Sequence, residues 1–236
     1  MNFNFEQIAI IHSCYKEKFG IPRQAGLVAE ATATIELLKP YNHPDMVKGL
    51  NGFSHIWLMF VFDQHIGKGF NHLVSPPRLN GKEQYGVYAT RSPFRPNPIG
   101  LSVVNLDKIE YQQDKIFLHV KGADLLDKTP IIDIKPYIEY ADSINNTQKG
   151  FISAIKDNNF KIGFSELANS QIIAAEKNIP QLRLFIQELL ALDPRPHYNK
   201  SIKKHYTAHI YQYDLHWQIN DLDIQVLSLE LKNLAE

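Results

Sequence analysis

Hydrophobic and polar positions follow two different patterns along the chain, and the pattern changes near residue 165. Before residue 140, short apolar or β-branched runs are separated by turn-forming residues, as in 32–38 (TATIELL) and the aromatic run 53–62 (FSHIWLMFVF). Many short strands at fairly even spacing favour a closed sheet or a sandwich. The other predicted strands of this part are residues 5–12, 86–90, 102–109, 115–120 and 131–134.

The last third of the chain begins with helical spacing. Residues 165–178 and 181–192 carry apolar side chains three or four positions apart, which predicts two amphipathic helices. Ser165 is a suitable first residue for the first helix, and Pro180 prevents its continuation.

Alternating segments at 207–219 and 223–229 end the chain, and Asn220 and Asp221 between them predict a hairpin turn. The stretch before the helices is polar and rich in Asn and Lys, which is typical of a linker or a surface excursion. We therefore expect a mainly β fold in three parts: a β domain at 1–145, a linker at 146–163, and a small α+β domain at 164–236.

The run 53–62 is apolar on both of its alternating faces, apart from Ser54 and His55. This pattern predicts a strand that is buried on both sides. The rest of the β domain would cover one side, and we expect a partner subunit to cover part of the other.

Composition narrows the class of protein. The 236 residues include 25 Lys and Arg and 25 Asp and Glu, balanced within each half of the chain, so any contact with nucleic acid must come from local patches. The single cysteine, Cys14, excludes an internal disulfide framework and a cysteine-based zinc site. No signal peptide and no apolar run of about 20 residues is present, so we expect a cytoplasmic protein without a membrane segment.

Several common site motifs are missing from the sequence. A dinucleotide-binding or common methyltransferase domain would carry a glycine-rich turn between a strand and a helix, and residues 67–70 (GKGF) do not meet that pattern. No Walker motif is present, and the ten histidines do not stand at metal-ligand spacing, so we expect no metal site.

The most unusual segment is 90–101, TRSPFRPNPIGL. Its prolines stiffen an extended backbone, and Arg91 and Arg95 on such a loop are suited to hold an anion or a carboxylate. The alternative is a stiff connection whose arginines cap backbone carbonyls.

Two other segments carry candidate chemistry. The aspartate-rich turn 124–137 (DLLDKTPIIDIKPY) offers carboxylates for a hydroxyl, an amine or a proton, and the loop 19–26 (FGIPRQAG) offers Arg23 and Gln24. Each also has an ordinary interpretation, as a turn or a loop with solvated polar residues.

Together and in order, these segments resemble the TsaA-like (TrmO) family of tRNA (adenine-N6)-methyltransferases. The resemblance rests on PRQAGL, GFSHIWLMFVF, GVYATRSPFRPNPIGLS, DLLDKTPIIDIKPY and LDPRPHY, and it covers nearly the whole chain. It implies a β-barrel that binds S-adenosylmethionine (SAM) without a Rossmann sheet, followed by a small C-terminal domain. It also implies a homodimer that methylates N6 of N6-threonylcarbamoyladenosine at position 37, in the anticodon stem-loop of threonine tRNA.

The resemblance also implies a cofactor site and two departures from the family pattern. Ala25 stands where proline is usual, and Lys128 stands where glycine is frequent, which would stiffen the aspartate turn. The implied SAM contacts are Gln24, Ala25, Gly26, Gln64, His65, Arg91, Leu101, Lys121, Gly122, Ala123 and Asp124.

The implied reaction needs few protein groups. Removal of the N6 proton would make this acylated nitrogen a better nucleophile, and our candidates for the base are Asp124, His65 and Tyr137 in that order. Arg95 or Lys135 would pair with the threonyl carboxylate. In the C-terminal domain, a small basic cluster just after Arg195 has two tyrosines nearby, which suits an anticodon loop; its members are Lys200, Lys203, Lys204 and His205. Of this region we expect Arg195, Lys203 and Lys204 to contact the tRNA.

Two other functions remain open from the residues alone. The first keeps the SAM site but changes the substrate to a small molecule or another RNA. The second is a SAM-binding module without catalysis, which senses the cofactor or recruits a partner.

Overall fold

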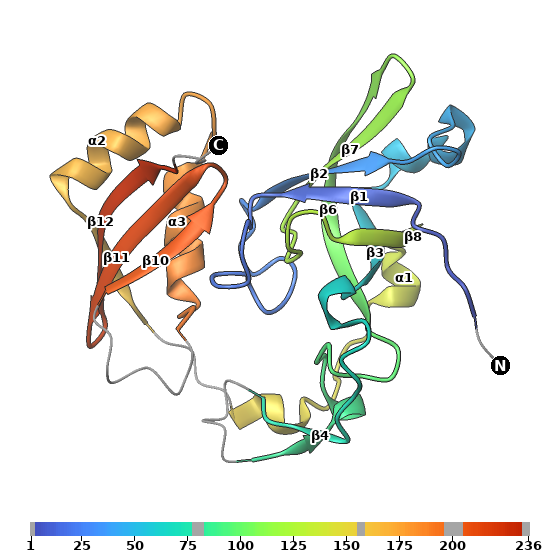
Figure 1. Cartoon of the computed structure of the whole chain (residues 1–236), viewed down its shortest axis with the longest axis horizontal. Helices are drawn as coiled ribbons and strands as arrows, with labels where there is room; N and C mark the ends of the chain where they lie inside the picture. Colours follow the sequence, from blue (N-terminus) through green and yellow to red (C-terminus); the bar gives the residue numbers. More distant parts are fainter. Residues whose placement is uncertain (1–2, 77–82, 155–158, 196–204, 233–236) are drawn as a thin grey trace.

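The first half of the chain forms a closed antiparallel barrel in the computed structural model, which describes residues 3–76, 83–154, 159–195 and 205–232. The strands pair in the order β1-β2-β7-β6-β3-β8 and close on β1, as Figure 1 shows on its right-hand side. Their bounds are β1 Ala9–Ser13, β2 Thr32–Leu37, β3 His55–Val61, β6 Ile99–Gln112, β7 Lys115–Lys121 and β8 Pro130–Pro136. The closed barrel and the small number of helical residues beside it confirm the predicted mainly β fold class.

Alternation along the strands builds the barrel core. In β3, Ile56, Leu58 and Phe60 are buried inside, and the residues between them lie half-buried on the outer face. Within one chain this strand is therefore buried on its inner face, as predicted, and the expected cover of its outer face by a partner subunit stays a prediction. On its outer face Trp57 donates a hydrogen bond to Asp142 at 3.0 Å, from the short helix α1 (Glu139–Asp142).

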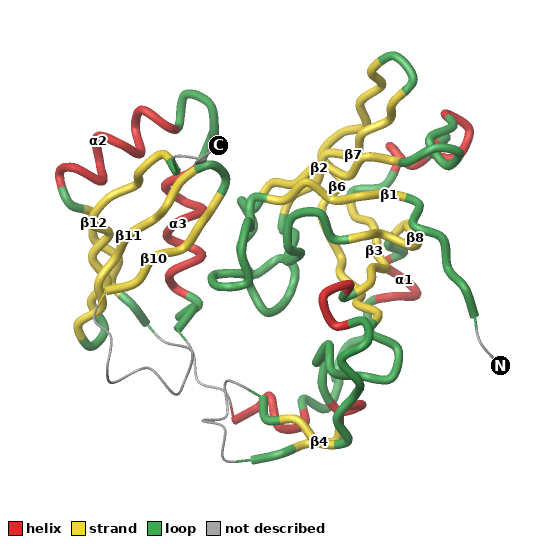
Figure 2. The backbone as a smooth tube through the Cα atoms, in the orientation of Figure 1, coloured by secondary structure: helices red, strands yellow, loops and turns green. Residues whose placement is uncertain are grey.

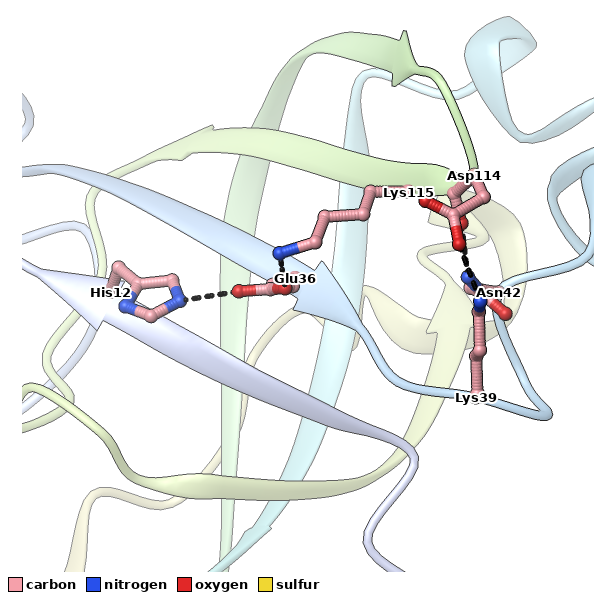
Figure 3. Close-up of polar contacts among 6 residues, drawn as sticks. All are labelled: His12, Glu36, Lys39, Asn42, Asp114 and Lys115. Carbon is pink, nitrogen blue, oxygen red and sulfur yellow. Dashed lines mark hydrogen bonds and ion pairs between the residues drawn. The ribbon is translucent and has the colours of Figure 1, made fainter.

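The outer barrel face that includes β1 and β2 is polar. Figure 3 shows the Glu36 carboxylate between His12, at 3.0 Å, and Lys115, at 2.9 Å. Hydrogen bonds from Lys115 and His12 lower the pKa of Glu36. Lys39 and Asn42 both contact Asp114 on the turn between β6 and β7, so these contacts tie the ends of three strands together.

An excursion extends from one end of the barrel and appears at the bottom of Figures 1 and 2. Strand β4 (Leu73–Val74) pairs with β5 (Tyr85–Gly86), and the Tyr85 ring lies 4.2 Å from the ring of Phe151. Residues 87–89, which we predicted to continue a strand from 86 to 90, instead form a 3₁₀ turn.

The C-terminal part is a four-stranded sheet with two helices. Its strand order is β10-β11-β12-β9, and β9 runs parallel to β12. Helix α2 packs along β12, and helix α3 contacts α2 and β9. The bounds are β9 Lys161–Phe164, α2 Glu166–Ala175, α3 Leu182–Ala191, β10 His205–Ile210, β11 Tyr213–Asn220 and β12 Asp223–Leu231.

Local signals located these helices and one turn. The Ser165 hydroxyl caps α2 by accepting a hydrogen bond from the Ala168 amide at 3.0 Å, as its sequence position predicts. The turn at Asn220 and Asp221 joins β11 to β12, and Asp221 has a φ of 51°. Among the described helices, none is long and apolar enough to cross a membrane.

Two expectations for this part are wrong. The segment 207–219 is two strands, because Tyr211, with a φ of 51°, reverses the chain between β10 and β11. Strand β9 begins at Lys161, inside the stretch 146–163 that we expected to be a linker. Both features depend on partners distant in the sequence, which local patterns do not reveal.

Lys128 leads to a stability prediction. Its φ is 68°, a conformation that costs a side-chain-bearing residue roughly 1–2 kcal/mol and costs glycine little. We expect Lys128→Gly to raise the free energy of unfolding by about 0.5–1 kcal/mol, since the greater freedom of glycine in the unfolded chain offsets part of the gain. Urea unfolding measures this change. Lys128→Ala removes the same charge but keeps the strain, so an equal gain in that variant would contradict the conformational explanation.

Candidate cofactor and active site

One cavity at an end of the barrel collects most of the chemistry-bearing segments. Its volume is about 630 Å³, within the range of roughly 300–1,000 Å³ that is typical of small-molecule sites. Four stretches contribute to its walls: the loop after β1, the end of β3 with the following 3₁₀ turn, the proline loop that leads into β6, and the aspartate turn before β8.

A glycine leaves room for an aromatic ring beside this cavity. Gly100 on β6 pairs with Phe60 on β3, and a Cβ atom at position 100 would lie 2.8 Å or less from three atoms of the Phe60 ring. The Phe60 ring in turn meets Phe62 edge-on at a centroid distance of 5.1 Å. The aromatic wall of the cavity therefore depends on the missing side chain at Gly100.

Asp124 is the carboxylate of the cavity. The hydroxyl of Ser102, itself buried on β6, donates a hydrogen bond to its Oδ1 at 2.6 Å. Burial raises the pKa of Asp124, against the opposing effects of Ser102, Arg91 and a hydrogen bond with the Ala25 backbone. A desolvated carboxylate with an elevated pKa is suited to accept a proton in a reaction.

The two arginines of the proline loop both reach the cavity but have different contacts. Arg91 is exposed and donates a short hydrogen bond to the side-chain oxygen of Gln24 across the cavity mouth. Arg95 donates to the Thr90 carbonyl at 3.3 Å, which is the carbonyl capping that we considered as the alternative. Since a guanidinium has five N–H donors, this one bond leaves Arg95 able to hold an anion as well.

His65 lies at the edge of the same cavity, on the 3₁₀ turn Asp63–His65. Its ring meets Phe94 edge-on at 4.8 Å. Burial, followed by the nearby charges of Lys18 and Lys68, lowers the pKa of His65. The imidazole is therefore neutral at pH 7 and able to accept a proton.

The structure brings seven of the site residues predicted from the sequence to this cavity. Five others do not line it: Gly26 donates its backbone N–H to the Gly122 carbonyl at 2.8 Å, and Lys121 pairs with Glu30 at 3.3 Å on another surface. The cavity-lining residues are Gln24, Gln64, His65, Arg91, Arg95, Leu101 and Asp124. The five that do not line it are Ala25, Gly26, Lys121, Gly122 and Ala123.

Tyr137 and Lys135 do not line this cavity. Lys135 lies near the end of β8 and Tyr137 directly after it, beside the end of β3 that is farther from the cavity. There Lys135 is opposite Trp57 in the strand register, and Tyr137 packs against His55 and Trp57. The Lys135 ammonium lies 2.6 Å from the carboxylate of Asp133. Within one chain, the structure therefore leaves Asp124 and His65 as the candidate bases and Arg95 as the candidate cation.

The basic C-terminal cluster receives little support from the described residues. The Arg195 side chain is 11% exposed and donates two hydrogen bonds to Asp193, at 2.6 and 3.1 Å. Its guanidinium also lies 5.7 Å from the Phe160 ring, so it serves the packing of this domain. Lys203 and Lys204 lie outside the described residues.

Sequence reasoning missed Ser102 and Tyr88. Ser102 occupies an inward position of β6 between Gly100 and Val104, and a polar residue in such a run of small and apolar inward residues was a usable signal. Tyr88 lines the cavity and is 78% exposed, and nothing in its local sequence distinguishes it from a surface residue.

The residues present fit SAM. Its amino-acid part and ribose need an anionic partner and a cationic partner, and its adenine needs an apolar surface. Asp124 and Arg91 would supply the charged partners, and Leu101, which is 49% exposed on the cavity wall, would supply apolar contact.

Comparisons with known proteins match both parts of the chain to one family. The family model described as tRNA-methyltransferase O N-terminal domain matches residues 10–143, and the TrmO C-terminal domain model matches residues 157–232. A tRNA (adenine(37)-N6)-methyltransferase of Escherichia coli K12 is 42% identical over 97% of this chain and 98% of the relative.

Two further similarities point the same way. A putative S-adenosylmethionine-dependent methyltransferase, RcsF, of Pseudomonas aeruginosa is 39% identical over 92% of this chain and 93% of the relative. The crystal structure of TrmO from P. aeruginosa superposes with a TM-score of 0.79 at 34% identity, covering 97% of this chain and 98% of that one. The barrel, the cavity and both family models together show that this chain belongs to the TrmO family.

Proposed function

We propose that this chain is a SAM-dependent enzyme that methylates N6 of adenine 37 in tRNA. The observation that carries the proposal is the half-buried, desolvated Asp124 carboxylate, held by Ser102 in a cavity that also receives Arg91 and Arg95. The E. coli relative is a tRNA (adenine(37)-N6)-methyltransferase, which supports the choice of substrate atom.

The chemistry requires positioning and one proton acceptor. Bound SAM supplies a methyl group already activated on a sulfonium. The protein's task is to hold the nucleophile in line with this methyl group and to take the N6 proton. Asp124 is the first candidate for the proton acceptor because it is desolvated, and neutral His65 at the cavity edge is the second.

The finer substrate is N6-threonylcarbamoyladenosine in threonine tRNA. Its threonyl carboxylate needs a cation near the methyl-transfer site, and Arg95 on the cavity wall has N–H donors beyond the one bonded to Thr90. The acylated N6 is also more acidic than a free amine, which suits a carboxylate base. Both features favour the modified nucleoside over plain adenosine.

The test is methyl transfer from labelled SAM to threonine tRNA with and without the threonylcarbamoyl group, followed by nucleoside analysis. We expect the modified tRNA to react and the unmodified tRNA to react at least about 100-fold more slowly, since a charge-assisted pair with a carboxylate contributes roughly 1.5–3 kcal/mol and the free amine is a poorer match for the base. Equal rates would contradict the role of the threonyl carboxylate.

Arg95→Gln sharpens this test, with Lys135→Gln as the matched control. We expect Arg95→Gln to raise KM for the modified tRNA and to leave the slow rate on unmodified tRNA unchanged. Lys135→Gln removes a cation that pairs with Asp133 outside the cavity. A larger effect in the Lys135 variant would move the carboxylate site to that end of β8.

A SAM-binding module without catalysis is the second candidate function. Cofactor binding without methyl transfer to either tRNA would favour it over the enzyme. Asp124 and Arg91 would contact the cofactor in both functions. Only a measurement of turnover therefore separates the enzyme from the binding module.

We also propose that the protein is a cytoplasmic homodimer, in keeping with a tRNA substrate. The outer face of β3 and β6 supports the dimer, because it presents the half-buried Met59 beside Leu101. A partner subunit on this strip would border the cavity through Leu101. Sedimentation analysis of the full chain tests the oligomeric state.

A further inference from the structure

The loop after β1 packs against the C-terminal part of the molecule and also lines the cavity of the barrel. It leaves the barrel at Ser13, and Figure 1 shows the blue segment between β1 and β2 on the side of the barrel that faces β10. Its buried residues, Cys14, Tyr15, Val28 and Ala31, lie in the hydrophobic core of the C-terminal part and not in that of the barrel.

An aromatic stack anchors the middle of this loop. The Phe19 ring lies parallel to the Trp217 ring of β11, with a centroid distance of 5.8 Å and an interplanar angle of 5°. Tyr206 of β10 stacks on the same Trp217 at 5.8 Å. Trp217 is fully buried, so the stack fixes Phe19 against a rigid sheet.

Backbone contacts fix the rest of the loop on the same hairpin. The Tyr211 N–H donates to the Cys14 carbonyl at 2.7 Å, and the Glu17 carboxylate accepts from the His209 N–H at 2.8 Å. Gly20, with a φ of 92°, lies beside β10, where a Cβ would be in ordinary van der Waals contact with the Ala208 methyl group at 3.5 Å.

The same loop forms one wall of the cofactor cavity. Lys18 precedes Phe19 directly, and residues 21–24 follow Gly20; all of these line the cavity. Gln24 is the residue that accepts the hydrogen bond of Arg91 across the cavity mouth. The C-terminal sheet therefore contacts a loop that also lines the cavity proposed for the cofactor.

We propose that Phe19 and Trp217 are positioning residues that make the C-terminal domain a structural part of the cofactor site. This inference rests on the proposed function, because it assigns them to the SAM cavity. When the stack is lost, the loop samples conformations in which Gln24 and Arg23 leave the cavity wall. The apparent Kd for SAM then rises by the inverse of the fraction that remains in place.

The experiment is calorimetric titration of the full chain and its Phe19→Ala variant with SAM. We expect Kd to rise about tenfold, which corresponds to a tenth of the molecules keeping the loop in place. Phe19→Tyr keeps the ring and is expected to restore Kd close to that of the wild type. Phe19→Leu is measured in the same way, so that the test stands if the alanine variant does not fold.

Ile172→Ala is the matched control. Ile172 is fully buried in the same C-terminal core but lies on α2, which packs along β12. We expect this variant to melt at a lower temperature than the wild type with an unchanged Kd for SAM. An equal rise of Kd in both variants would reduce the stack to general stability and overturn the proposal.

Trypsin supplies a readout that does not depend on SAM. Lys18 and Arg23 flank the stacked part of the loop, and we expect Phe19→Ala to accelerate cleavage after both residues under native conditions, with Ile172→Ala cleaved there at the wild-type rate. If the wild type binds no SAM, the proposed function fails while faster cleavage still shows that the stack holds the loop. If the wild type binds SAM and Phe19→Ala binds it equally well, the positioning role is overturned and the proposed function stands.

Discussion

Asp124→Asn is expected to lower kcat for methyl transfer by about 10²–10⁴-fold, the usual contribution of a positioned proton acceptor. The amide keeps the shape of the carboxylate and its hydrogen bond with Ser102, but it cannot take the N6 proton. We expect Kd for SAM to rise as well, because Asp124 is also the anionic partner offered to the cofactor, but by a smaller factor than kcat falls. Loss of binding with kcat retained at saturating SAM would show that Asp124 serves the cofactor and not the base.

The pH dependence of this variant follows from the raised pKa of Asp124. Wild-type activity is expected to rise with pH through a pKa above the usual value of about 4, because the carboxylate is the active form. The residual activity of Asp124→Asn lacks this acidic limb. A pH–rate profile of kcat over the acidic range for both proteins makes the comparison.

The raised pKa of Asp124 also predicts that Asp124→Asn is more stable than the wild type at neutral pH. Because burial raises the pKa, the folded state binds the Asp124 proton more tightly than the unfolded state does. This contribution is complete below the unfolded pKa and is lost as the pH rises through the folded pKa. At neutral pH the wild type holds an ionised, desolvated carboxylate, so Asp124→Asn is expected to unfold at higher urea concentration than the wild type.

Asp127→Asn is the matched control on the same turn. Asp127 accepts a hydrogen bond from the Ser13 backbone at 2.8 Å and pairs with Lys16 at 2.9 Å, outside the cavity. We expect this variant to lose stability and to keep kcat, the reverse of the Asp124 variant. The same pattern in both variants would reduce Asp124 to a structural residue.

The second large effect is expected for Gly100→Ala. The new methyl group would lie 2.8 Å or less from three atoms of the Phe60 ring, so the ring or the strand must move. Overpacking of this kind costs about 1–3 kcal/mol of stability. Since Phe60 lines the cavity and meets Phe62 edge-on, the shift also moves the cavity wall and weakens SAM binding.

Urea unfolding and SAM titration measure the two effects of Gly100→Ala, and a second substitution identifies their cause. Phe60→Leu in the Gly100→Ala background removes the ring that the methyl group meets. We expect the double variant to be more stable than the sum of the two single changes predicts, with a coupling of about 1 kcal/mol or more. Strict additivity would mean that Gly100 is required for its backbone and not for the space beside Phe60.

Local structure in this protein was readable from the sequence wherever its cause is local. The continuous apolar run in residues 53–62 identified β3, and Ser165 marked the start of α2, because a short apolar run and a helix cap are both read from neighbours along the chain. The strand predicted over 86–90 failed for the opposite reason. Val87 is buried there by tertiary packing in a 3₁₀ turn, whatever its β propensity.

The sequence also located the segments that carry chemistry, but not which side chains meet. Asp124 and Asp133 stand in one motif. Closure of the barrel places Asp124 against Ser102 of β6, and it leaves Asp133 with Lys135 outside the cavity. Membership of a motif is a property of the chain, whereas desolvation and a shifted pKa belong to the assembled barrel.

The sequence by itself therefore determined a mainly β chain with two C-terminal helices and the motifs of a SAM site. The tertiary structure alone decided the turn at Tyr211, where the Cys14 carbonyl accepts its N–H and no residue typical of a turn is present. It also decided that Phe19, in a loop with no pattern of its own, stacks on Trp217 from the far end of the chain. Contacts between residues nearly 200 positions apart leave no periodic trace in either segment, because each supplies only half of the buried surface.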